Sequence, residues 1–202
     1  MKKLKIAVTG GIGSGKSKAL ELLKELGYPT YSCDEIYKSI ITTQEYVKQL
    51  NERFPTCVEN GEINRSKLAS IIFDDPQKRK SLNAIAHPLI LKSLFNAIEL
   101  ENSNIVFVEV PLLFEEKLEN QFDKVIVINR KTNKRIEAIQ ARDNISQEEA
   151  EKRLRAQLDY TSSEAEESFK KCAAIIINNS GNLEELKKQL IDTANFISKD
   201  LS

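Results

Sequence analysis

The sequence lacks the features of a protein that binds polyanions or membranes through bulk charge. Thirty lysines and arginines balance thirty aspartates and glutamates, so the formal net charge is zero. Without a net positive field, the composition favours neither nucleic acid nor an anionic membrane as a partner. The apolar runs are only as long as β-strands, too short for a membrane span or the core of a signal sequence, and we therefore expect a cytoplasmic protein.

Cysteine and histidine are scarce too. Cys33, Cys57 and Cys172 lie far apart and form no CxxC pair, which argues against a disulfide framework or a zinc site and indicates reduced thiols. His87 is the only histidine, so no second histidine can join it in a metal site. The remaining composition, 41% hydrophobic and 30% charged, is that of a globular chain.

Glycine is rare as well, and four of the seven glycines fall between Gly10 and Gly15. They belong to GGIGSGKS, Gly10–Ser17, which matches GxxxxGK[ST] between a β-branched run and an amphipathic helical pattern. Successive backbone N–H groups can surround a phosphate only where no Cβ obstructs them. This phosphate loop (P-loop) predicts a nucleoside triphosphate bound by Gly11, Ile12, Gly13, Ser14, Gly15, Lys16 and Ser17, with a purely structural turn as the alternative.

Two side chains of the phosphate loop add specific chemistry to its backbone. Lys16 would place an ammonium near the β- and γ-phosphates, and Ser17 would offer a hydroxyl to Mg²⁺. The positive end of the helix that begins near Lys16 adds to the attraction for the anion.

Short apolar runs alternate with longer helical patterns along the chain. Five runs are interpreted as strands, and three of them are nearly continuous in valine and isoleucine, as in parallel strands covered on both faces. The runs are residues 5–9, 29–33, 104–110, 124–129 and 173–178. The predicted fold class is α/β, an open five-stranded parallel sheet flanked by helices, which binds ligands at the carboxyl ends of its strands.

Residues 36–101 break this alternation. They contain no convincing strand but several helical patterns, with Asp75 as an expected N-cap and Pro88 as a point where a helix restarts or kinks. We predict a helical substrate-side insertion here and a helical lid over residues 131–160. The nucleotide-binding core then consists of residues 1–35, 102–130 and 161–202.

Two classes of nucleotide-binding protein compete at this point. A GTPase-type switch carries DxxG and NKxD segments, and the chain has neither beyond the phosphate loop. A small-molecule kinase that phosphorylates an alcohol benefits from a carboxylate that orients the hydroxyl and accepts its proton. Asp34, directly after the second strand, is the candidate for that role, and the N-cap of a helix from residue 35 onward is the alternative interpretation.

Arginines gather in the predicted lid. Arg135, Arg142, Arg153 and Arg155 fall on two successive helical patterns, the second of which begins with the capping-box sequence Ser146–Glu149. Guanidinium groups stabilise the transferring phosphoryl oxygens, so the stretch as a whole predicts a lid that closes over the nucleotide. Taken singly, each arginine is more typical of a solvated surface charge.

Together these segments resemble the dephospho-coenzyme A kinase family, from Ile6 to about Leu186. The resemblance is carried, in order, by VTGGIGSGKS, CDEI, GEINRSKLASIIFDDP, LNAIAHPLI, VEVPLLFE, RDNISQEEAEKRLRAQ and NNSGNLEEL. It implies a P-loop kinase fold and an enzyme that uses ATP and Mg²⁺ to phosphorylate the ribose 3′-hydroxyl of dephospho-coenzyme A. That reaction is the last step of coenzyme A biosynthesis.

The resemblance also implies roles for individual residues. The catalytic residues would be Lys16, Asp34 and Arg142. ATP would also contact Arg153 and, near its adenine, Asn179, and Gln157 matches the glutamine that closes the lid segment. The substrate cleft would be lined by Asp34, Arg65, His87 and Pro88, and Mg²⁺ would be held by Ser17 and Glu109.

The chain departs from the family pattern at a few positions. Ser32 and Glu109 stand where the family has aspartates, Ala138 replaces a lid arginine for which Arg135 is the nearest substitute, and Arg155 is an additional charge. The alternative function is that of a kinase of the same architecture acting on a nucleoside, a nucleoside monophosphate or a shikimate-like alcohol. The sequence predicts no oligomeric state.

Overall fold

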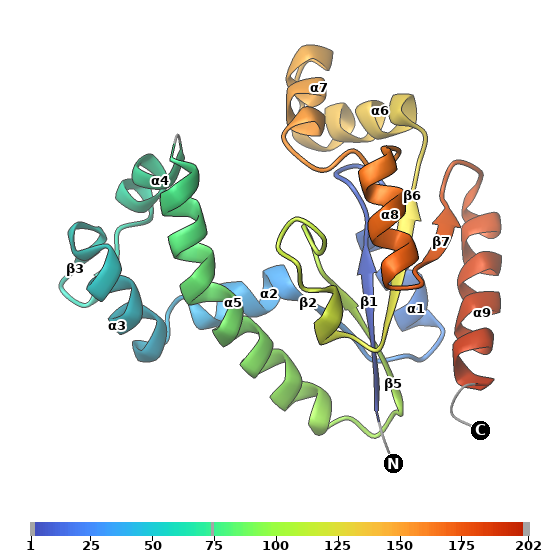
Figure 1. Ribbon diagram of the computed structural model, residues 1–202, viewed down its shortest axis with the longest axis horizontal. Helices are drawn as coiled ribbons and strands as arrows, with labels where there is room; N and C mark the ends of the chain where they lie inside the picture. Colours follow the sequence, from blue (N-terminus) through green and yellow to red (C-terminus); the bar gives the residue numbers. More distant parts are fainter. Residues whose placement is uncertain (1–2, 74, 200–202) are drawn as a thin grey trace. The chain divides into compact units, whose positions relative to one another are not determined.

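The computed structural model describes residues 3–73 and 75–199; residues 1–2 and 200–202, at the ends of the predicted core, lie outside the described part. The chain forms two compact units (Figure 1). The core unit is Met1–Ser32 with Glu101–Ser202, and the helical unit is Cys33–Leu100. In the described residues, no helix has the length and apolar character that crossing a membrane requires.

The core unit is built on one parallel sheet with the strand order β2-β5-β1-β6-β7. This confirms the predicted five-stranded parallel α/β fold. The strands are β1 (Leu4–Thr9), β2 (Thr30–Ser32), β5 (Ile105–Glu109), β6 (Lys124–Asn129) and β7 (Ile175–Asn178). The runs rich in valine and isoleucine in β5 and β6 are buried because helices cover both faces of the sheet, whereas Ile176 of the edge strand β7 is 54% exposed.

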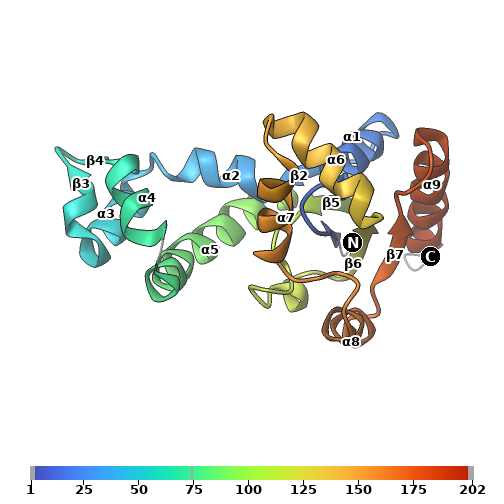
Figure 2. The same ribbon diagram turned by 90° about the horizontal axis from the view of Figure 1, so that it is seen from above.

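Alternate residues of the strands face opposite helical layers. Ile6, Val8 and Phe107 belong to a core shared with α1 (Lys16–Glu25) and α9 (Leu183–Lys199). Figure 2 shows α8 (Ser163–Lys171) on the opposite side of the sheet from α1. The last helix, α9, buries Leu186, Leu190, Ala194 and Ile197, but Leu183, at its first turn, is 48% exposed.

The register brings the carboxyl ends of the strands to one edge of the sheet. Glu109 at the end of β5 is in register with Ser32 of β2 and Val8 of β1. The phosphate loop leaves β1 at this edge, and α6 (Thr132–Asp143) and α7 (Gln147–Arg155) lie beyond it (Figure 1). A parallel sheet therefore gathers loops that are far apart in the sequence around one end of the core unit.

The helices of the predicted lid have strong end signals. Asn144 ends α6 in the left-handed conformation (φ 52°). The predicted capping box is confirmed: the Ser146 hydroxyl accepts from the Glu149 N–H, and the Glu149 carboxylate accepts from the Ser146 N–H. These end signals fix a tight turn between two helices that carry arginines. The role of residues 131–160 as a moving lid remains a prediction.

The helical unit has its own apolar core, centred on the buried Tyr46, Leu50 and Leu82. Its elements are α2 (Cys33–Ile40), α3 (Gln44–Arg53), the 3₁₀ turn η1 (Pro55–Cys57), β3 (Val58–Glu59), β4 (Glu62–Ile63), α4 (Arg65–Phe73) and α5 (Pro76–Glu99). The two short strands were not predicted. They flank Asn60-Gly61, both with positive φ, which is the turn that a two-residue β-hairpin favours.

Helix α5 is continuous from Pro76 to Glu99, so of the two outcomes predicted at Pro88, a restart or a kink, the restart does not occur. The Asp75 side chain accepts hydrogen bonds from the N–H groups of Gln77 and Lys78, which confirms the predicted N-cap. Figure 1 shows α5 changing direction near its middle. Pro88 explains this bend, because proline removes one helical hydrogen bond and crowds the carbonyl of the preceding turn.

Candidate active site

The phosphate loop holds its backbone in conformations that favour glycine. Gly13 and Gly15 have φ values of 76° and 93°. Gly15 is the N-cap of α1 and has no side chain to cap it, so the first N–H groups of α1 are directed at whatever occupies the loop. An anion at this position would meet both these donors and the positive end of α1.

Close neighbours also require the absence of side chains in this loop. A Cβ on Gly10 would lie 2.3 Å from the Ile128 carbonyl oxygen, and one on Gly11 would lie 2.2 Å from Nη2 of Arg135. Arg135 is only 5% exposed, and its Nε donates to the Ile12 carbonyl at 2.9 Å. Burial lowers the pKa of Arg135, and the charge of Asp159 opposes that shift. The guanidinium proposed above as a substitute for the lid arginine is thus held against the phosphate loop, where it stays charged.

Three further side chains hold the same loop from distant parts of the chain. The Gln157 Oε1 accepts from the Ile12 N–H at 2.8 Å, and the Asn179 Nδ2 donates to the Ser14 carbonyl at 2.8 Å. Arg130 donates from Nη1 to the Gly13 carbonyl at 3.3 Å. Sequence reasoning missed Arg130, although its position directly after β6 was a usable signal. Asn179, expected near adenine, contacts the loop that would hold the phosphates.

Lys16 and Ser17 have partners that suit their predicted roles. The Lys16 ammonium arches over the loop and donates to the carbonyls of Gly10 at 2.7 Å and Gly11 at 3.2 Å. The Ser17 hydroxyl donates to Oε1 of Glu109 at 3.0 Å, and Glu109 is buried at the end of β5. The structure therefore brings together the two residues that the resemblance named for Mg²⁺.

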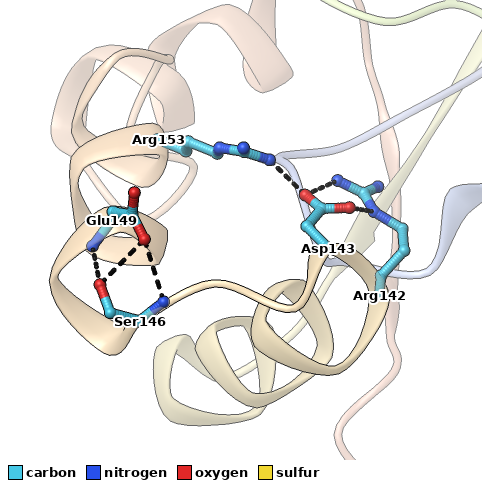
Figure 3. Close-up of polar contacts among 5 residues, drawn as sticks. All are labelled: Arg142, Asp143, Ser146, Glu149 and Arg153. Carbon is cyan, nitrogen blue, oxygen red and sulfur yellow. Dashed lines mark hydrogen bonds and ion pairs between the residues drawn. The ribbon is translucent and has the colours of Figure 1, made fainter.

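The two arginines predicted to contact ATP meet one carboxylate (Figure 3). Arg142 donates from Nε to Oδ1 of Asp143 at 2.7 Å and from Nη2 to Oδ2 at 2.9 Å. Arg153, from α7, donates from Nη1 to the same Oδ2. The additional Arg155 lies apart from this cluster and pairs with Glu151 at 3.7 Å.

The segment that follows α7 is anchored at the end of β1. Tyr160 is buried, and its hydroxyl lies 3.3 Å from the Thr9 hydroxyl. Burial is the main cause that raises the pKa of Tyr160, so the phenol stays neutral. Its ring packs with Phe114 and Phe169. Tyr160 was not identified from the sequence, since no local pattern connects it to a strand so distant in the chain.

The helical unit contains a cavity of about 400 Å³ that brings together Asp34 and Arg65. Its other lining residues are Tyr37, Lys38, Ile41, Tyr46, Ile63, Leu68, Ala69, Ile72 and Leu82. Charged groups on a largely apolar wall are typical of a small-molecule site. His87 and Pro88 do not line this cavity.

The start of α2 decides the alternative interpretation of Asp34. Since α2 begins at Cys33, Asp34 lies within its first turn, and the N-cap alternative is wrong.

Gly11 offers a test of the packed loop. We expect Gly11→Ala to weaken ATP binding about tenfold, because overpacking of this kind costs ~1–3 kcal/mol. The clash is with Arg135, so Gly11→Ala combined with Arg135→Ala should bind ATP no worse than Arg135→Ala alone. Titration with a fluorescent ATP analogue measures the affinities. Gly61→Ala, in the helical unit, should bind like the wild type, and additive losses in the double variant would contradict the packing.

Curated relatives give these features a family context. The dephospho-CoA kinase of Thermus thermophilus is 34% identical to the chain over 185 residues, which is 92% of the chain and 87% of that relative. The dephospho-CoA kinase of Geobacillus kaustophilus is 34% identical over 194 residues, with 93% and 94% covered.

Solved structures agree with these relatives. A crystal structure from Thermus thermophilus has a TM-score of 0.80 at 31% identity and covers 96% of this chain and 98% of its own. Dephospho-CoA kinase from Campylobacter jejuni has a TM-score of 0.67 at 29% identity, with 98% of each chain covered. Shikimate kinase from Bacteroides thetaiotaomicron, at 11% identity and a TM-score of 0.55, shares the fold alone. Because the dephospho-CoA kinase family model matches residues 4–185, the resemblance seen in the motifs is confirmed and the chain belongs to the dephospho-CoA kinase family.

Proposed function

We propose that this chain transfers the γ-phosphoryl group of ATP to the ribose 3′-hydroxyl of dephospho-coenzyme A. The products are coenzyme A and ADP, and the reaction completes coenzyme A biosynthesis. The observation that carries the proposal is the phosphate loop, with Lys16 arched over it and Ser17 bonded to Glu109, in a chain that matches the family over residues 4–185. Bare helical N–H groups and a lysine suit a polyphosphate.

The core unit binds ATP. The N–H groups of the phosphate loop surround the phosphates, and Lys16 exchanges its carbonyl partners for phosphate oxygens. Arg142 and Arg153 supply further positive charge to the transferring group, which carries charge on its equatorial oxygens. Asn179, on the loop after β7, holds the Ser14 carbonyl and would contact the nucleotide from that position.

Ser17 and Glu109 would hold Mg²⁺. They offer a hydroxyl and a carboxylate, the hard oxygen donors that Mg²⁺ prefers, and phosphate oxygens and waters complete such a site. In the described residues, no group of three histidine, cysteine, aspartate or glutamate side chains is placed to hold a metal ion. When bound, the ion neutralises charge on the phosphates.

The helical unit binds dephospho-coenzyme A. Arg65 and Lys38 on the cavity wall suit the anionic groups of this substrate, and the apolar lining suits its uncharged parts. His87 and Pro88 contact the substrate outside this cavity. Asp34 follows the end of β2 by two residues and orients the 3′-hydroxyl. Its carboxylate accepts the hydroxyl proton as the oxygen bonds to the γ-phosphorus and the bond to ADP breaks.

A panel of acceptors tests the reaction. With ATP and Mg²⁺, a coupled assay of ADP release should respond to dephospho-coenzyme A and not to nucleosides, nucleoside monophosphates or shikimate. Mass spectrometry of the product should show coenzyme A. Turnover of another acceptor in preference to dephospho-coenzyme A would contradict the proposal.

Asp34→Asn tests the proposed base. We expect turnover to fall roughly 10²- to 10⁴-fold, the usual range for removal of a general base, while ATP affinity stays near the wild-type value. Glu35→Gln is the matched control, because Glu35 is the next residue in the same helical turn and does not line the cavity. Near-normal turnover of Asp34→Asn would remove Asp34 from the chemistry.

Glu109→Gln tests the proposed metal residues. The amide keeps the shape of the side chain but lacks its charge, so the Mg²⁺ concentration for half-maximal activity should rise about tenfold, equivalent to ~1.4 kcal/mol. Glu184→Gln, an exposed position on α9, should leave this concentration unchanged. An unchanged Mg²⁺ dependence in Glu109→Gln would assign the ion to other groups.

A further inference from the structure

Asp143 joins two arginines that come from different helices. It is the last residue of α6, it follows Arg142 directly, and it meets Arg153 from α7 across the turn (Figure 3). One carboxylate oxygen accepts from Arg142 alone, and the other accepts from both arginines. The carboxylate is 19% exposed, whereas the side chains of Arg142 and Arg153 are 61% and 47% exposed. Asp143 is therefore the inner member of a group whose cations face outward.

The position of Asp143 is unfavourable for the helix itself. The carboxyl end of a helix carries partial negative charge, so a carboxylate there is destabilising unless cations offset it. The hydrogen bonds from Arg142 are the main cause that lowers the pKa of Asp143, and the charge of Arg153 acts in the same direction. Asp143 is thus ionised at neutral pH. The two arginines, and not the charge at the end of α6, therefore explain why a carboxylate occupies this position.

The pairing orders the arginines without using up their donors. Asp143 binds Nε and Nη2 of Arg142 and Nη1 of Arg153, so Nη1 of Arg142 and Nη2 of Arg153 are not engaged by it. Two guanidinium groups at one turn repel each other and are long and flexible when unpaired. A shared carboxylate offsets the repulsion and leaves the group with a net charge of +1, which still attracts phosphates.

We propose that Asp143 is a positioning residue for catalysis: it holds Arg142 and Arg153 together so that both meet the phosphates of ATP. The proposal rests on the proposed function, in which these arginines contact ATP. Asp143 itself touches neither ATP nor the acceptor. Preorganised donors bind a developing charge better than flexible ones, because their ordering precedes the reaction.

The alternative is that Asp143 opposes ATP binding, and this alternative predicts the opposite change in ATP affinity. A carboxylate bound to the two arginines competes with phosphate for the same cations, and its removal would then tighten ATP binding. The exposed donors of both arginines favour positioning over competition, since phosphate can bind them while Asp143 keeps its own bonds. The sign of the change in ATP affinity separates the two effects.

The experiment measures Asp143→Asn and Asp143→Ala in the full-length protein. We expect the KM for ATP to rise on the order of tenfold, as for loss of a charge-assisted hydrogen-bond group, with a smaller fall in kcat. The KM for dephospho-coenzyme A and the melting temperature should stay at the wild-type values. Glu137→Gln, an exposed glutamate on α6, removes the same charge from the same segment and should leave every parameter unchanged.

A second background shows whether Asp143 acts through the arginines. In a variant with Arg142→Ala and Arg153→Ala, adding Asp143→Asn should raise the KM for ATP less than twofold further, because interacting residues are not additive. A full tenfold rise in that background would overturn the proposal. So would an unchanged or lower KM for ATP in the single variants, or a parallel rise in the KM for dephospho-coenzyme A.

Different results test the proposed reaction and the positioning role of Asp143. Wild-type protein that does not phosphorylate dephospho-coenzyme A contradicts the proposed function, whatever the variants do. If the wild type is active, a fluorescent ATP analogue gives the dissociation constant of each variant without turnover. An Asp143→Asn protein that binds this analogue as tightly as the wild type overturns the positioning role alone.

Discussion

The structure depends on the close approach of backbone to backbone at the phosphate loop. Gly10 and Gly13 lie so near the carbonyls of Ile128 and Arg135 that no side chain fits. This contact ties the loop to the end of β6 and the start of α6. Because Gly15, in the same loop, leaves the first N–H groups of α1 without a side-chain cap, the loop that packs so closely is also an anion site. Packing and binding therefore constrain the same few positions.

The arginines around this loop form an inner pair bound to its backbone and an outer pair exposed to solvent. Arg135 is buried against the loop and Arg130 binds the Gly13 carbonyl, while the exposed Arg142 and Arg153 are paired on Asp143. Inner guanidiniums fix the backbone, and outer ones are presented to solvent. A chain with zero net charge thus concentrates positive charge at one sheet edge, where a parallel fold places its ligands.

Local signals made most of the fold predictable. The strands followed from continuous valine and isoleucine, the phosphate loop from its glycine spacing, and the cap at Asp75 from its position before Pro76. The β3-β4 hairpin was missed although Asn60-Gly61 is a strong turn signal, because each strand has only two residues.

The candidate site was only partly predictable. Lys16, Ser17 and Asp34 stand in motifs, whereas Arg130, Tyr160 and the pairing of Asp143 arise from contacts between segments that no local pattern connects. The bond between Ser17 and Glu109 spans 92 positions and became visible only through the register of β1 and β5. The phosphate-loop motif named Ser17 and the family resemblance named Glu109, and the sheet explains why they meet.

Residues near both ends of the segment 131–160 bind the phosphate loop. Arg135, near the start of the segment, binds the Ile12 carbonyl, and Gln157, near its end, binds the Ile12 N–H. The start and the end of this segment therefore bind the two backbone polar groups of one residue, Ile12. While both hydrogen bonds hold, the two ends of this segment stay fixed to the phosphate loop, and only the residues between them, around Asn144, are left free of this constraint.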